Sequence, residues 1–133
     1  KTIAPHAISY PMTSHFNVSH GQAVCITLPD ILKYNYKNTQ YSVANFDIKK
    51  RFNNIFKALN LKNINDLEGF IKKIISDTGL TNSIVDLGVK KKSDIDLILK
   101  NINMQRLKNN PITITNDNIK EILRDKVGNN KVF

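Results

Sequence analysis

Three histidines and the only cysteine of the chain lie within its first 25 residues: His6, His15, His20 and Cys25. Neutral imidazoles are good ligands for iron and zinc. A helix that carries His6, followed by a loop and a second helix that begins at His20, could bring both rings to one point. Because a closed metal site takes three or four protein ligands, spacing alone leaves two readings open: a shared metal, or ordinary polar and capping histidines.

The elements that must position these rings are two helices. We expect a short helix over about residues 3–10, ended by Pro11, and a second helix from His20 to about Asn35 with Ser19 as its N-cap. Pro29 would then lie inside the second helix, where it removes a hydrogen bond and bends the axis.

Helical periodicity dominates the sequence from about residue 45 onward. A capping pattern predicts a helix that starts at Asn65, another opens near Ser93, and Thr115 or Asn116 caps a last one. Only residues 112–114 read as extended. The prediction is an all-α chain, a bundle of helices with short connections that forms one domain over residues 1–133 and frays after residue 128.

The composition is that of a globular domain, with 41% hydrophobic and 23% charged residues. No secretory signal precedes the first helix, and no apolar run is long enough to cross a bilayer. A single cysteine allows no internal disulfide, so a cytoplasmic location is the expectation. The chain begins with Lys1 rather than Met, which indicates a piece of something longer.

The formal net charge of +9 leaves nucleic acid as an alternative partner. The lysines are scattered along the chain, however, and the densest cluster, residues 90–92, adjoins a predicted helix start. Because no basic–aromatic pattern accompanies them, we interpret the charge as solvated surface and expect neither a nucleic-acid nor a membrane partner.

The first 35 residues carry a recognisable series of motifs: HAISYP from His6, HGQA from His20, and LPDILKYN from Leu28 to Asn35. This series closely resembles the metal-binding stretch of the group III, iron-containing alcohol dehydrogenases. A His-Ala, a His-Gly, a Leu-Pro and a Tyr-Asn all occur at that family's spacing. DLGV at residues 86–89 and Asn-Pro at residues 110–111 fit its C-terminal helical domain, which has a dehydroquinate synthase-like fold.

By this resemblance, His6 and His20 are two of four ligands of a divalent iron, with Zn²⁺ as the alternative metal. The other two ligands, an Asp and a His one turn later, lie on an earlier helix of the family. The nucleotide-binding domain that holds NAD or NADP is N-terminal and also outside this chain. The resemblance therefore implies the metal-binding half of an alcohol dehydrogenase or aldehyde reductase. That half would be inactive alone, and the full-length protein would be a homo-oligomer acting on a small alcohol or aldehyde.

One position departs from the family pattern. Many members carry a histidine four residues after the first ligand, and here that position is Tyr10. We expect Tyr10 to lie near the substrate. Because phenols ionise only at about pH 10, a tyrosine is a poor proton shuttle near neutrality. The Ser-Tyr-Pro version resembles a subgroup that acts on small polar aldehydes, of which phosphonoacetaldehyde-like ones are a candidate.

The remaining polar and aromatic candidates are interpreted as structural. We expect His15 at the surface, Cys25 in the core, Asn35 as a helix cap, and Tyr34, Tyr36 and Tyr41 in packing or at an interface. Two other functions stay open on the sequence: a basic helical module that binds nucleic acid, and a structural or dimerisation domain whose histidines are vestigial.

Overall fold

The structure is a computed structural model that describes residues 1–128. Those residues form helices and no β-strand, which confirms the all-α prediction. The α-helices are α1 (Ala4–Phe16), α2 (His20–Cys25), α3 (Leu28–Lys37), α4 (Ile48–Ala58), α5 (Ile64–Asp77), α6 (Lys92–Lys100), α7 (Met104–Leu107) and α8 (Asn116–Val127). Two 3₁₀ turns, Thr39–Tyr41 and Val85–Leu87, join them. The predicted fraying after residue 128 lies outside the described residues.

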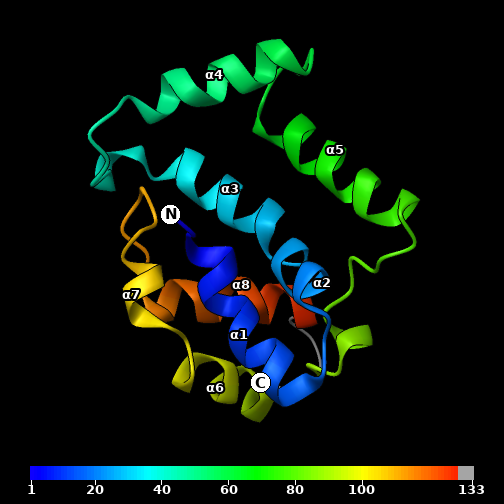
Figure 1. Ribbon diagram of the computed structural model, residues 1–133. Coiled ribbons are helices and arrows are strands. Elements are labelled where there is room, and N and C mark those ends of the chain that lie inside the picture. Colours follow the sequence, from blue (N-terminus) through cyan, green and yellow to red (C-terminus); the bar gives the residue numbers. More distant parts are fainter. Residues whose placement is uncertain (129–133) are drawn as a thin grey trace.

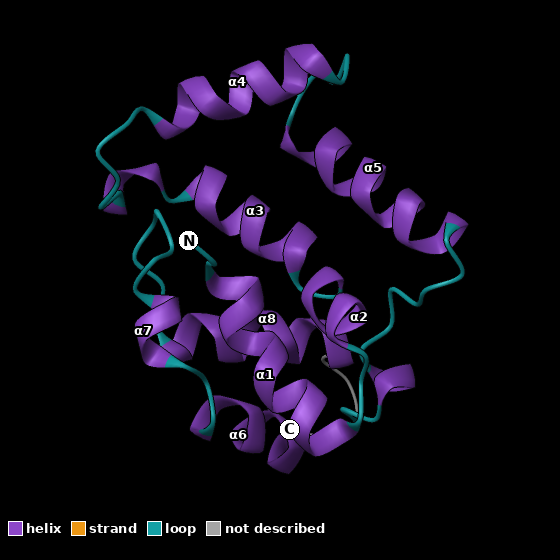
Figure 2. Ribbon diagram, viewed as in Figure 1, coloured by secondary structure: helices purple, strands orange, loops and turns teal. Residues whose placement is uncertain are grey.

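Helix α1 runs through the larger of two apolar cores (Figures 1 and 2). It packs against α2, α3, α6 and α7, and α8 covers α6. Four of its side chains, Ala4, Ala7, Ile8 and Met12, are fully buried. Because core residues that lose all contact with water contribute most to stability, α1 is the best-anchored element of the chain.

Helices α4 and α5 form a second, smaller unit, which we call the arm (residues 48–77). In Figure 1 the arm lies apart from α1, with α3 between them. Its core holds Ile48, Phe52, Phe56, Ile64, Leu67 and Ile112. Phe70 and Ile74 of α5 are 37% and 46% exposed, so the apolar stripe of this helix is only partly buried.

The extended segment 112–114 joins the two cores. Ile112 belongs to the core of the arm, whereas Ile114 belongs to the core around α1. The segment makes one isolated bridge, between Ser42 and Ile112, so the extended reading of the sequence is confirmed without a sheet. An amide pair fixes the preceding residue: Asn110 donates to the side-chain oxygen of Asn35 at 2.8 Å and to the Ile112 carbonyl at 2.7 Å.

The prediction that Pro11 ends the first helix is wrong. Helix α1 continues through Pro11 to Phe16, and Asn17, in the left-handed region with φ 54°, ends it. The proline costs one hydrogen bond, but Met12 on the next position is fully buried, and that burial favours continuing the helix.

The prediction of one helix from His20 to Asn35 is also wrong. One helix ends at Cys25 and the next begins at Leu28, and Pro29 lies in the first turn of α3. The missing N–H of a proline costs nothing there, because the first-turn amides of a helix have no partner within the helix. Pro29 therefore starts a helix instead of bending one.

The caps of the later helices differ from expectation by one to two residues at two of the three sites. Asn63, not Asn65, caps α5 by accepting from the Asp66 amide, and α6 starts at Lys92, before Ser93. Thr115 caps α8 as predicted. Within residues 1–128, no helix is long and apolar enough to span a membrane.

Candidate metal centre

Three aromatic side chains predicted to form the site do come together. His6 lies in the first turn of α1, Tyr10 one turn further along it, and His20 is the first residue of α2. The ring centroids of His6 and His20 are 5.5 Å apart, and those of Tyr10 and His20 are 6.1 Å apart. His6 is half-buried, while His20 and Tyr10 are exposed. The three rings therefore form one open cluster at the corner between α1 and α2.

The corner that brings the histidines together is built locally. Asn17 turns the chain in the left-handed conformation, Val18 is buried beneath the turn, and its amide reaches back to the Met12 carbonyl at 3.4 Å. Ser19 occupies the N-cap position of α2 as predicted, but its side chain makes no capping hydrogen bond. The backbone amides of the first turn of α2 are thus free of a side-chain acceptor from Ser19.

The two imidazoles fit a shared metal ion. With metal–nitrogen bonds of about 2.0–2.1 Å, two rings on one ion have centroids roughly 5 Å apart, close to the 5.5 Å observed. Among residues 1–128, no hydrogen bond or ion pair engages either imidazole. Nor do any three His, Cys, Asp or Glu side chains in that range gather closely enough to hold a metal. The corner can supply two ligands, and further ones would have to come from elsewhere.

The match to a family model decides what this corner is part of. Residues 1–127 match the model of the C-terminal region of the Fe-containing alcohol dehydrogenase family. The chain belongs to this family. As a member of this family, the chain carries His6 and His20 on the described elements α1 and α2.

A solved structure shares the fold of this chain. Sulfoacetaldehyde reductase from Bifidobacterium kashiwanohense, in complex with NAD⁺, superposes with a TM-score of 0.77 at 22% sequence identity. The match covers 96% of this chain and 31% of that one. The chain thus spans about a third of the length of its structural neighbour. No curated protein sequence matches it.

Sequence reasoning missed one residue beside the cluster, Arg106 in α7. Its guanidinium carbon lies 4.8 Å from the centroid of the Tyr10 ring, and one of its nitrogens donates to the Thr2 hydroxyl at 2.8 Å. A cation over an aromatic face is an attractive contact. No sequence pattern relates residue 106 to residue 10; only the packing of α7 against α1 brings them together.

The other candidates take structural places. His15 is exposed in the last turn of α1, as expected. Cys25 is half-buried and not in the core. Asn35 is not a cap: it is 2% exposed and paired with Asn110.

The tyrosines pack, as predicted, in two of three cases. Tyr36 makes edge contacts with Phe52 and Phe56 in the arm. Tyr34 donates to the Thr113 carbonyl at 2.9 Å, and burial, together with the nearby Tyr41, raises the pKa of its phenol. Tyr41 is 58% exposed.

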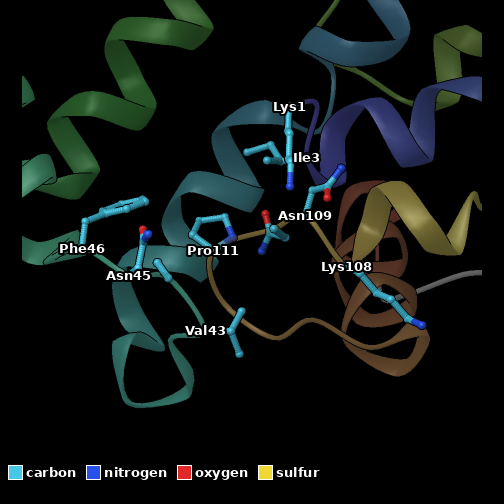
Figure 3. A pocket seen from close by; sticks show the side chains of 10 residues that line it. Lys1, Ile3, Val43, Asn45, Phe46, Lys108, Asn109 and Pro111 are labelled. Carbon is cyan, nitrogen blue, oxygen red and sulfur yellow. The ribbon is translucent and has the colours of Figure 1, made fainter.

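A pocket of about 570 Å³ opens elsewhere, between the segment after α3 and the loop before α8 (Figure 3). Its wall includes Phe46, Asn45, Lys108 and Pro111. None of the three ring residues of the α1–α2 corner lines it, so it is separate from the candidate metal centre.

Proposed function

We propose that this chain is the metal-binding half of an NAD(P)-dependent alcohol dehydrogenase or aldehyde reductase, and that it is inactive without the nucleotide-binding domain. The observation that carries the proposal is the His6–His20 ring pair, 5.5 Å apart, in which neither imidazole makes a hydrogen bond or an ion pair among residues 1–128. Family membership over residues 1–127 supports iron as the metal, with Zn²⁺ as the alternative.

When bound, a divalent metal would act as a Lewis acid on the substrate oxygen while a nicotinamide exchanges hydride with the adjacent carbon. His6 and His20 would hold the metal through ring nitrogens, from two different helices whose corner fixes their separation. Tyr10, against the His20 ring, would form one side of the substrate space and offer a hydroxyl for hydrogen bonding.

The substrate class proposed is a small alcohol or aldehyde. The structural neighbour is named for sulfoacetaldehyde and holds NAD⁺, and we take sulfoacetaldehyde and NADH as first candidates for this protein. Phosphonoacetaldehyde-like compounds are the second.

The test is His20→Ala in the full-length protein that contains this chain, with His15→Ala as the matched control. His15 is an exposed histidine near the same corner but outside the ring cluster. Bound iron is measured by elemental analysis and aldehyde reduction by NADH consumption. We expect His20→Ala to lose tightly bound metal and at least about 100-fold in activity, since losing a ligand removes the Lewis acid, while His15→Ala keeps both. Retained metal and activity in His20→Ala would sink the assignment.

A further inference from the structure

Arg106 is the cation nearest the ring cluster for which the structure shows a contact. It stacks on Tyr10, and Tyr10 in turn contacts His20. A single aromatic ring therefore separates the guanidinium from a proposed metal ligand. A substrate whose oxygen is held at His6 and His20 would extend past Tyr10 toward Arg106 if it has a second functional group.

The charge of Arg106 is not neutralised within residues 1–128. Its side chain contacts the Tyr10 ring and the neutral Thr2 hydroxyl, and no carboxylate of that range lies within ion-pair distance. Half-buried lysines elsewhere behave differently: Lys126 pairs with Asp30, and Lys33 with Glu68, each at 2.7 Å. Because a guanidinium has five N–H donors, most of those of Arg106 remain for a ligand.

The surroundings of Arg106 suit an anion. It lines an open pocket of about 540 Å³ whose other walls are all polar: Lys1, Thr2, Asn103, Gln105 and Asn109. None of the three ring residues lines this pocket, and the contact between Arg106 and Tyr10 is what links it to the ring cluster. Asn109 is itself held by a hydrogen bond to the Thr2 carbonyl, and the Arg106 backbone amide is capped by Asn103. The Tyr10 ring and the Thr2 hydroxyl orient the guanidinium itself, and a planar, oriented guanidinium binds sulfonate, phosphonate or carboxylate oxygens through paired hydrogen bonds.

We infer that Arg106 is a specificity-determining residue that selects aldehydes carrying an anionic group. Tyr10 is its positioning residue, because its ring contacts both the Arg106 guanidinium and the His20 ring. This inference rests on the proposed function, and it narrows the substrate from any small aldehyde to an anionic one.

The experiment compares an anionic and a neutral substrate in the full-length protein. The values of kcat/KM for sulfoacetaldehyde and for propionaldehyde are measured with NADH in the wild type, Arg106→Gln and Arg106→Lys. Arg51→Gln is the matched control, because Arg51 also stacks on an aromatic ring, Phe46 at 4.7 Å, but on α4.

We expect Arg106→Gln to lower kcat/KM for sulfoacetaldehyde about 10–100-fold, the usual effect of one charge-assisted hydrogen bond, and to change that for propionaldehyde less than about 3-fold. Arg106→Lys should recover part of the loss, and Arg51→Gln should change neither substrate. An equal loss on both substrates in a folded Arg106→Gln protein would show a merely structural role and overturn the inference.

A binding measurement separates this inference from the proposed function. The metal-free protein is titrated calorimetrically with 2-hydroxyethanesulfonate, the alcohol that corresponds to sulfoacetaldehyde. We expect Arg106→Gln to bind it at least about 10-fold more weakly than the wild type does, and Arg106→Lys to give an intermediate Kd. If the wild type reduces neither aldehyde, the proposed function fails. This titration then tests anion binding by Arg106 independently of activity, and equal Kd values in the wild type and both variants would overturn the inference.

Discussion

Helix α1 and helix α5 both carry several large apolar side chains, but they bury them to very different degrees. On α1, Ile8 and Met12 are fully buried, whereas on α5 Phe70 and Ile74 are more than a third exposed. The difference lies in the neighbours: α1 packs against four helices, while the main partner of α5 is α3. An apolar stripe predicts that a helix has an inner face, but the arrangement of the other helices decides how far that face is covered.

This comparison has a consequence for the site. The ring cluster stands on α1 and α2, which belong to the well-covered region, and none of its residues lies on the arm. Residues that must hold a fixed separation are best placed on rigid elements. The arm, held by fewer contacts, is free to vary without moving His6 relative to His20.

The largest predicted effect is a loss in the free energy of unfolding of the 133-residue chain caused by Ile8→Ala, with Ile74→Ala as the comparison. Ile8 is 0% exposed and Ile74 is 46% exposed. Truncating a buried isoleucine to alanine lowers the free energy of unfolding by about 2–5 kcal/mol. Truncating an exposed one changes it by no more than about 0.5 kcal/mol. Urea unfolding followed by circular dichroism measures both free energies of unfolding. Similar losses in the two variants would refute the contrast between α1 and the arm.

A middle-sized effect is expected for Asn110→Ala, at the boundary between the two regions. The change removes the hydrogen bonds that Asn110 donates to the Asn35 side-chain oxygen and to the Ile112 carbonyl, both in buried surroundings. An unsatisfied buried polar group costs about 1–3 kcal/mol. The same urea experiment measures it, with exposed Asn53→Ala on α4 as a control expected within about 0.5 kcal/mol. A neutral Asn110→Ala would mean that the amide pair does not hold the two regions together.

The smallest effect concerns Glu68, which pairs with Lys33 of α3 and with Lys72 of its own helix α5. Glu68 accepts from both Lys33 and Lys72 at 2.7 Å. Burial alone would raise the pKa of Glu68, but these two ammonium groups outweigh it and lower the pKa from its ordinary value of 4.5. The stabilisation is therefore fully present above that value and is lost as the pH falls through the lowered pKa.

Glu68→Gln should accordingly destabilise the chain by less than about 1 kcal/mol at neutral pH, because the pairs are partly exposed. The difference between variant and wild type should disappear at an acid pH below the lowered pKa of Glu68, where the carboxyl is protonated and neutral. Unfolding free energies at the two pH values test this. A difference that persists at acid pH would assign the effect to packing of the side chain and not to its charge.

The sequence predicted the fold class for reasons that are local, whereas spacing alone left the role of His6 and His20 open, and only the resemblance to a family's motifs named them as ligands. Periodic apolar residues specify helices, and the spacing of His6 and His20 follows from a helix, a turn and a helix start. The errors concern single positions in the sequence, but their cause lies in the tertiary structure. Pro11 and Pro29 were each assigned the wrong position within a helix, because the burial of Met12 and the break after Cys25 depend on the rest of the fold.

Two parts of the site region had no signal in the sequence. Arg106 reaches Tyr10 only because α7 packs against α1. Asn35 appeared to be a helix cap because it lies near a helix end, but its partner Asn110 is 75 positions away. Contacts of such separation cannot be read from spacing along one element.

That same separation bears on how fast the chain folds. The Asn35–Asn110 pair closes a loop of 75 positions, and the entropy lost in closing so long a loop must be repaid before Ile112 and Ile114 can enter their cores. The helices on either side have mostly local contacts and can form early. We therefore expect the segment at residues 110–114 to dock late, so that its closure, and not helix formation, limits the folding rate of the whole chain.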